Sequence, residues 1–271
     1  MQVSVLINSN RPWDEVVRIA QTVDEAGAHA VYVPDHFMPN TEDDRIVDGP
    51  RLEAWTQLSA LSQRTSSCLL GALVLGAAYR HAAVVANMVA SLDTISGGRA
   101  IAGLGAGWQV NEHAAYGMDL MTPRDRSDRF EESVHVVSSL LREPRTTFEG
   151  RYFQLRDAPN QPAPLQERLP VLVAGKGEQR TLRTAAKYAD VWHTWGTPES
   201  FGAKNRALDE RCAEIGRDPA TVKRASGFFV DDISDGAATV APWQGVCEEF
   251  VFGDVGHPAD QLIDAVVTAI G

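Results

Sequence analysis

The feature that most constrains this chain is a regular alternation of short apolar segments with longer amphipathic ones. Short apolar runs predict strands, and apolar residues at helical spacing predict helices between them. Because neighbouring parallel strands must be joined by a crossover, this alternation predicts a parallel sheet of the α/β class. Eight such units fit a closed (β/α)8 TIM barrel, a single domain over residues 1–271. A doubly wound open sheet is the rival arrangement.

The predicted elements follow this alternation over most of the chain. The predicted strands cover residues 2–7, 30–33, 69–75, 100–104, 171–174, 191–194, 225–230 and 249–252. The predicted helices cover residues 13–25, 52–63, 81–95, 124–142, 178–188, 199–215 and 258–270. After the fourth helix, residues 146–155 predict a hairpin around Glu149-Gly150, and residues 159–170 are rich in proline. We expect this hairpin and loop to be an insertion that lies over the barrel.

Charge and cysteine content exclude several classes of protein. Lys plus Arg number 25 and Asp plus Glu number 36, a net charge of −11, whereas nucleic-acid binding requires a basic surplus. The cysteines, Cys68, Cys212 and Cys247, are odd in number and far apart, which favours a reducing compartment over a disulfide framework. The start of the chain does not resemble a signal peptide, and no apolar run is long enough for a membrane helix. We expect a cytoplasmic protein without nucleic-acid or membrane partners.

The second predicted strand ends in a pair of residues that can exchange protons. In a (β/α)8 barrel, chemistry collects where the strands end and the following loops begin. There the chain carries Asp35 and His36, a carboxylate beside an imidazole that titrates near neutral pH. The alternative is that Asp35 caps a turn after Pro34 and His36 is a surface residue. The seven histidines form no HxH or HExxH pattern, so we expect no metal.

The third and fourth predicted strand ends carry no acid–base group. Residues 71–76 are apolar, which suits either a flat aromatic ring or a simply buried strand. Residues 103–108 read Gly-Leu-Gly-Ala-Gly-Trp, and Trp108 occupies the place of the last glycine in the dinucleotide-binding fingerprint. These glycines either admit a ligand close to the backbone or allow a tight turn.

The fifth and sixth predicted strand ends indicate an anion site and an aromatic wall. Gly175, Lys176 and Gly177 come directly before a predicted helix, whose free amides attract an anion that the glycines admit. A plain loop is the alternative. Residues 191–195 read Val-Trp-His-Thr-Trp and would form a wall for an aromatic ligand, unless Trp192 only packs in the core. Together these strand ends favour a phosphorylated, flat cofactor without naming it.

Several stretches together resemble the luciferase-like monooxygenase superfamily, and within it the flavin- or deazaflavin-dependent oxidoreductases common in actinobacteria. The likeness covers about residues 1–225. The matching stretches are Val33–Phe37, Leu52–Thr56, Leu70–Val74, Tyr79–His81, Ser91–Arg99, Gly103–Trp108, Asn111–His113, Ala174–Glu178 and Tyr188–Trp192.

This resemblance implies a barrel with the cofactor at its carboxyl-terminal mouth. Asp35 and His36 would lie beside the ring, and His36 would touch the substrate or the reacting ring edge. The bond between Leu73 and Val74 would match the non-proline cis peptide of the family. The cofactor-binding residues would be Asp35, Ala72, Leu73, Val74, Gly105, Ala106, Asn111, Ala174, Gly175, Lys176 and Gly177. The substrate pocket would include Trp55, Trp108, His193 and Trp195.

The chain departs from the family pattern at two places. Some deazaflavin-dependent relatives carry a glutamate proton donor just after the glycines of the fourth strand, where this chain has Trp108. His36 is therefore the expected proton donor. Residues 231–247 are short and rich in glycine where relatives carry a fuller helix, so we expect an irregular barrel there.

The sequence thus predicts an oxidoreductase that moves hydride between a small organic substrate and bound coenzyme F-420. An FMN-dependent monooxygenase that uses molecular oxygen is the alternative, and a cofactor-free barrel that only binds a ligand is the second alternative. The resemblance also suggests a homodimer, without indicating its surface.

Overall fold

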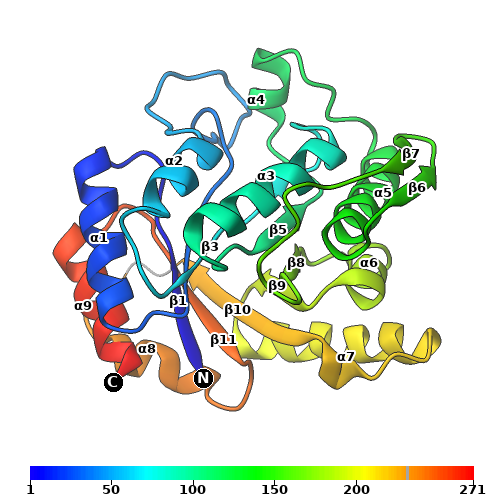
Figure 1. Cartoon of the computed structure of the whole chain (residues 1–271). Helices are drawn as coiled ribbons and strands as arrows, with labels where there is room; N and C mark the ends of the chain where they lie inside the picture. Colours follow the sequence, from blue (N-terminus) through cyan, green and yellow to red (C-terminus); the bar gives the residue numbers. More distant parts are fainter. Residues whose placement is uncertain (230–231) are drawn as a thin grey trace.

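The computed structural model describes residues 1–229 and 232–271, and a parallel sheet lies at its centre (Figure 1). The strands are β1 Gln2–Leu6, β2 Ala30–Val33, β3 Leu69–Ala72, β4 Leu75–Gly76, β5 Ala102–Gly105, β8 Val171–Ala174, β9 Val191–Trp195, β10 Lys223–Phe229 and β11 Glu249–Gly253. Their order is β3-β2-β1-β11-β10-β9-β8-β5-β4. A parallel bridge from Leu70 to Ala100 brings the two edges of the sheet together. The predicted (β/α)8 barrel is confirmed, and the single-domain boundary 1–271 stays a prediction.

One predicted strand is split in two. Residues 69–75 were expected to form a continuous strand, but Leu73 and Val74 lie between β3 and β4. The strand pairs with β2 before this point and with β5 after it, so β3 and β4 together occupy one position in the barrel. The bond between Leu73 and Val74 is a cis peptide, which confirms the expectation drawn from the family resemblance.

Helices cover the outside of the barrel, except for one short helix at its mouth. They are α1 Trp13–Glu25, α2 Ala54–Leu61, α3 Ala82–Ser96, α4 Val110–Ala115, α5 Pro123–Arg142, α6 Thr181–Tyr188, α7 Pro198–Glu214, α8 Gly236–Val240 and α9 Ala259–Ile270. Short 3-10 turns occupy Pro219–Thr221 and Ala241–Trp243. The helix expected to start at 178 begins three residues later, at Thr181, and the six-residue α4 is absent from the predicted elements.

Two other predicted segments, the hairpin and the strand over 225–230, are present in the structure. Residues 146–155 do contain a hairpin, whose antiparallel strands are β6 Thr146–Glu149 and β7 Gln154–Ala158. It lies outside the barrel beside α5 (Figure 1). The strand predicted over 225–230 is β10, except that Val230 lies outside the described residues, as does Asp231. Beyond them the crossover to β11 consists of short α8 and a 3-10 turn, and β10 still pairs with β11 over five residues.

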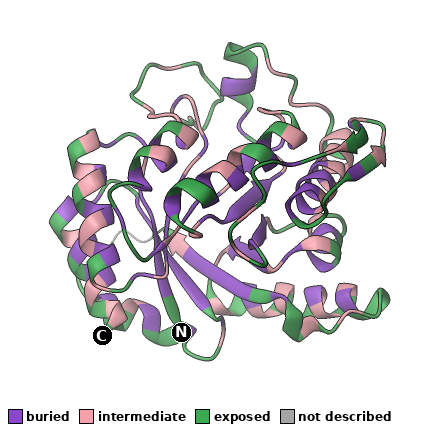
Figure 2. Ribbon diagram, viewed as in Figure 1, coloured by how far each residue is buried: buried purple, intermediate pink, exposed green. Residues whose placement is uncertain are grey.

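The buried side chains form two layers, because successive residues of a strand point to opposite faces. Figure 2 shows the strands as largely buried and the outer helix faces as exposed. The larger layer fills the space between the strands and the helices. The smaller layer fills the inside of the barrel and includes Leu6, Tyr32, Ile101, Leu172 and Val251. Towards the carboxyl ends of the strands this inner layer contains Gly103, Gly105, Gly227 and Gly253, where side chains would collide with neighbours.

These contacts predict that Gly103 tolerates no side chain. A Cβ there would lie 1.9 Å from the carbonyl oxygen of Ala72, next to the cis peptide. We expect Gly103→Ala to lower the free energy of unfolding by about 1–3 kcal/mol, measured by urea denaturation. The control is Gly202→Ala in α7, where a Cβ meets only the end of a flexible arginine at 3.9 Å. This control should raise stability by about 1 kcal/mol through helix propensity. Equal stability of Gly103→Ala and the unsubstituted chain would contradict this packing.

Candidate active site

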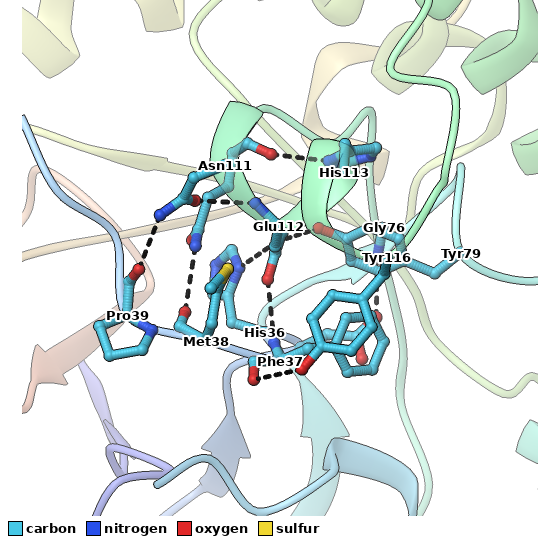
Figure 3. A network of polar contacts seen from close by, with 12 residues as sticks. His36, Phe37, Met38, Pro39, Gly76, Tyr79, Asn111, Glu112, His113 and Tyr116 are labelled. Atoms are coloured by element: carbon cyan, nitrogen blue, oxygen red, sulfur yellow. Dashed lines mark hydrogen bonds and ion pairs between the residues drawn. The ribbon is translucent and has the colours of Figure 1, made fainter. Parts of the chain in front are cut away.

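The polar centre of the barrel mouth is the carboxylate of Glu112 on α4 (Figure 3). Its side chain is completely buried. Oε1 accepts a hydrogen bond from the Tyr79 hydroxyl and lies 2.8 Å from Nδ1 of His36. Oε2 accepts from the backbone amide of Phe37 at 2.9 Å. A buried carboxylate is costly unless it is hydrogen bonded, and these three contacts bind α4 to the loop after β2 and to the turn after β4.

These contacts also determine protonation. Burial acts to raise the pKa of Glu112, but the hydrogen bonds with His36 and Tyr79 outweigh it, so that the pKa lies below its ordinary value. Burial and the adjacent carboxylate raise the pKa of Tyr79, so its hydroxyl keeps its proton and donates a hydrogen bond to Glu112. With an ionised Glu112, the hydrogen-bond network assigns a proton to Nδ1 of His36. Nε2 of His36 is then the ring nitrogen that remains for other chemistry.

His36 lies at the rim of the mouth. Its side chain is 26% exposed, and its ring meets that of Trp108 edge-on with 5.5 Å between the centroids. Trp108 itself is 56% exposed. His36 is therefore held in place by Glu112, and its ring remains partly accessible from outside.

Asp35 has a different environment from its neighbour in sequence. Its side chain is completely buried, and its two oxygens accept from the two terminal nitrogens of Arg80 at 2.7 and 3.0 Å. Oδ2 also accepts from the amide of Gly76 in β4, and Arg80 reaches Glu53 at 2.6 Å. This geometry is that of a positioning residue, which ties β4 to the end of β2. The predicted contact of Asp35 with a cofactor or substrate stays a prediction.

The glycines of β5 leave space for the bulge that Leu73 and Val74 form between β3 and β4. A Cβ on Gly105 would lie 2.3 Å from a methyl group of Val74, so the backbone of β5 must be bare for the bulge to pack against it. Ala72 and Leu73 are buried, Val74 is half-buried, and Ala106 packs against the outer core layer. The sequence left open whether these glycines admit a ligand or allow a tight turn with close packing. The structure describes close packing contacts for them.

Asn111 is buried and fixes the loop that follows β2. Its amide nitrogen donates to the carbonyl oxygens of Pro39 and Arg45 at 3.0 and 2.8 Å (Figure 3 shows the bond to Pro39). Its oxygen accepts from the amide of Glu112. Because both amide hydrogens have acceptors in the loop, the predicted contact of Asn111 with a cofactor stays a prediction.

The loop expected to bind an anion lies between β8 and α6. Gly175 has φ of +140°, which favours glycine, and a Cβ on Gly177 would lie 2.9 Å from the hydroxyl of Thr181. Lys176 and Gly177 are exposed, and Ala174 lines the inside of the barrel. The amide of Gly175 donates to His193, whereas the amides of residues 176–179 have no acceptor among the described residues. Free amides before a helix fit a phosphate group.

A row of aromatic rings lies at the ends of β9 and β10. His193 and Trp195 are 4.5 Å apart, and Trp195 and Phe229 are also 4.5 Å apart. Burial lowers the pKa of His193 to about 3, so the ring is neutral, and neither ring nitrogen has a partner among the described residues. Trp192 points the other way and stacks on Phe201, which leaves it out of the wall. Trp55 is half-buried on α2 and packs against the outer core layer.

Sequence reasoning missed four of these residues. Glu112, Tyr79 and Arg80 lie within stretches that matched the family, but no role was expected for them, and Phe229 was not singled out. The available signal was the run Asn111-Glu112-His113, three polar residues that the structure buries together on one short helix. A glutamate does reach the mouth, four residues beyond the position that Trp108 occupies.

No group of three or more His, Cys, Asp or Glu side chains in residues 1–229 and 232–271 could hold a metal ion. No helix within the same ranges is long and apolar enough to cross a membrane.

A parallel (β/α)8 barrel with a bulged third strand and a histidine–carboxylate pair at its mouth belongs to the class of barrel enzymes that place their chemistry at the carboxyl ends of the strands. The family model of the luciferase-like monooxygenases matches residues 1–244. The chain belongs to this family.

Known relatives and solved structures extend this assignment. The chain is 32% identical over 262 residues to the F420-dependent hydroxymycolic acid dehydrogenase of Mycobacterium tuberculosis, a match that covers 94% of the chain and 68% of the relative. It is 38% identical over 152 residues to an F420-dependent glucose-6-phosphate dehydrogenase of Kineococcus radiotolerans, which covers 54% of the chain and 44% of that relative. This match thus spans less than half of the latter protein.

A solved structure has the same fold. An F420-dependent secondary alcohol dehydrogenase in complex with an F420–acetone adduct superposes with a TM-score of 0.84 at 19% identity, over 99% of this chain and 98% of the other.

The buried imidazole of His193 predicts how stability depends on pH. Below the ordinary value of 6.5 the unfolded imidazole binds a proton that the folded one does not bind until about pH 3. The unfolded state then binds more protons, so stability falls with acidification by up to about 1.4 kcal/mol per pH unit between these values. We expect His193→Leu to reduce that slope, measured by urea denaturation at several pH values. An unchanged slope would show that His193 titrates in the folded chain.

Proposed function

We propose that this chain is an oxidoreductase that transfers hydride between an organic substrate and bound coenzyme F-420. The observation that carries the proposal is the match, over 94% of the chain, to a dehydrogenase named as F420-dependent. A second relative, the glucose-6-phosphate dehydrogenase, is also named as F420-dependent. The substrate of this chain is an organic molecule that can lose or gain hydride, and the residues at the mouth supply the proton chemistry.

The described residues fit a flat, phosphorylated cofactor. Leu73 and Val74, which lie between β3 and β4, form a bulge without charged groups, against which a flat ring can lie. The free amides of residues 176–179 and the exposed Lys176 supply donors for a phosphate group. When bound, the deazaflavin supplies the hydride acceptor or donor, and the protein supplies orientation and electrostatics.

His36 moves the proton that accompanies the hydride. When an alcohol is oxidised to a carbonyl, its carbon loses hydride and its oxygen loses a proton. Nε2 of His36 accepts that proton, because Nδ1 is held by Glu112. The imidazolium that forms is stabilised by the Glu112 carboxylate at 2.8 Å, and in the reverse direction His36 returns the proton. Trp108 packs against the imidazole and, with Trp195, is our candidate for the wall of the substrate pocket.

Other parts of the proposal are independent of the reaction. Three expectations remain predictions. They are a homodimer, a cytoplasmic location, which the three unpaired cysteines suggest, and the absence of nucleic-acid partners, which the acidic composition suggests. An enzyme that uses FMN in place of coenzyme F-420, with oxygen as co-substrate, would have the same barrel. A binding titration with both cofactors separates these two possibilities.

The cofactor assignment predicts a preference that a fluorescence titration measures. We expect coenzyme F-420 to bind more tightly than FMN, and Lys176→Ala to weaken F-420 binding about tenfold with a smaller change in kcat, since one charge-assisted contact to phosphate is lost. The control is Lys223→Ala at the amino-terminal end of β10, where an exposed lysine of equal charge is removed far from the loop. Binding of FMN alone would favour the monooxygenase, and binding of neither would favour a cofactor-free barrel.

The proton role of His36 predicts a loss of turnover without a loss of binding. We expect His36→Asn to lower kcat by about 10²–10⁴-fold and to leave the dissociation constant of coenzyme F-420 within about threefold of the original. Glu112→Gln should lower kcat as well, because a neutral amide stabilises the imidazolium less than a carboxylate does. Full turnover by His36→Asn would assign the proton transfer to another group.

A further inference from the structure

A basic cleft lies at the amino-terminal end of the barrel, where the proposed function uses no residue. It has a volume of about 550 Å³ and is lined by Arg142, Arg168, Lys187, Tyr188, Arg217 and Thr221. Arg142 ends α5, Lys187 and Tyr188 end α6, Arg168 precedes β8, and Thr221 precedes β10. Four cations therefore converge in one cleft of a chain whose net charge is −11.

The carboxylates that face this cleft do not balance its cations. Asp190 is shared by Arg142 and Arg168, each at 2.7 Å. Lys187 pairs with Glu131 of α5. Arg217 donates to the carbonyl oxygens of Ala186 and Ala189 and to Thr221, with no carboxylate partner among the described residues. Among the described residues, two carboxylates thus pair with these four cations, which leaves two positive charges in excess.

Several donors of these cations are also free to bind a ligand. Among the described residues, Arg142 uses only its Nη2 nitrogen, in contacts with Asp190 and the carbonyl of Tyr188. Arg168 directs Nε and Nη2 at Asp190, and its side chain is 60% exposed. A guanidinium carries five N–H donors in a planar fork that matches the oxygens of a phosphate. Burial lowers the pKa of Arg217; attraction to Asp190 opposes this shift, and repulsion by Arg168 and Arg142 adds to it, so these charged groups lie close together.

We propose that this cleft binds a phosphate dianion, either free or as the terminal group of a phosphate monoester. Two negative charges on one tetrahedral group match the two uncompensated positive charges, and the free guanidinium donors of Arg142 and Arg168 supply its hydrogen bonds. This site differs from the loop after β8 that we assign to the cofactor phosphate. The two lie at opposite ends of β8, because Arg168 precedes this strand and Lys176 follows it.

Isothermal titration of the intact chain with inorganic phosphate, at constant ionic strength, tests this proposal. We expect saturable binding that Arg168→Gln weakens at least tenfold and Lys187→Gln weakens to a smaller extent. The matched control is Arg145→Gln, which removes a 59% exposed arginine paired with Asp157 on the hairpin, outside the cleft. Lys176→Ala should leave phosphate binding unchanged, which separates this cleft from the cofactor loop.

Two results would overturn the proposal. One is phosphate binding that Arg168→Gln leaves intact. The other is no saturable binding of phosphate at concentrations up to about 10 mM, above which binding would not indicate a specific site. Circular dichroism of each variant confirms folding. Arg168 is suited to the test because the ion pair between Arg142 and Asp190 remains in Arg168→Gln. A second titration with a phosphate monoester, such as glycerol phosphate, shows which of the two forms binds more tightly.

Discussion

The structure of the barrel mouth depends on the hydrogen bonds to the buried, ionised carboxylate of Glu112 beneath His36. A buried charge without partners is costly, so the folded chain must bring donors to it. They come from the loop after β2 and from the turn after β4, which are otherwise separate parts of the chain. Asp35 acts in the same way one residue earlier, through Arg80 and the amide of Gly76. Two buried carboxylates thus fasten the same two segments, and they support the partly exposed imidazole of His36.

This arrangement explains why two adjacent acid–base residues have different roles. Successive side chains of an extended segment point in opposite directions. The side chain of Asp35 points inward to Arg80 and is shielded from solvent. The side chain of His36 points to the rim of the mouth and stays partly exposed. The cation that neutralises Asp35 also reaches Glu53, the residue that caps α2, so the start of that helix is positioned by the same network.

The sequence allowed the barrel to be predicted, but only part of the site. Strand and helix periodicity is a local property, so the alternation of elements from β1 to α9 could be recognised without knowledge of contacts. The cis peptide was expected from family resemblance alone. The contact between His36 and Glu112 spans 76 residues, and no local pattern reports such a pairing. The same limit applies to Asp35 and Arg80. Glycines 103 and 105 were left ambiguous because a ligand and a neighbouring backbone both require a missing side chain.

The order of the strands has a consequence for how the chain is made. β1 forms its hydrogen bonds with β2 on one side and with β11 on the other, and the register joins Gln2 to Glu249. In Figure 1, α1 and α9 accordingly lie side by side. The ring of strands cannot close until residues 249–253 have left the ribosome. Until then β1 presents an unpaired edge, at which the growing chain can misassociate.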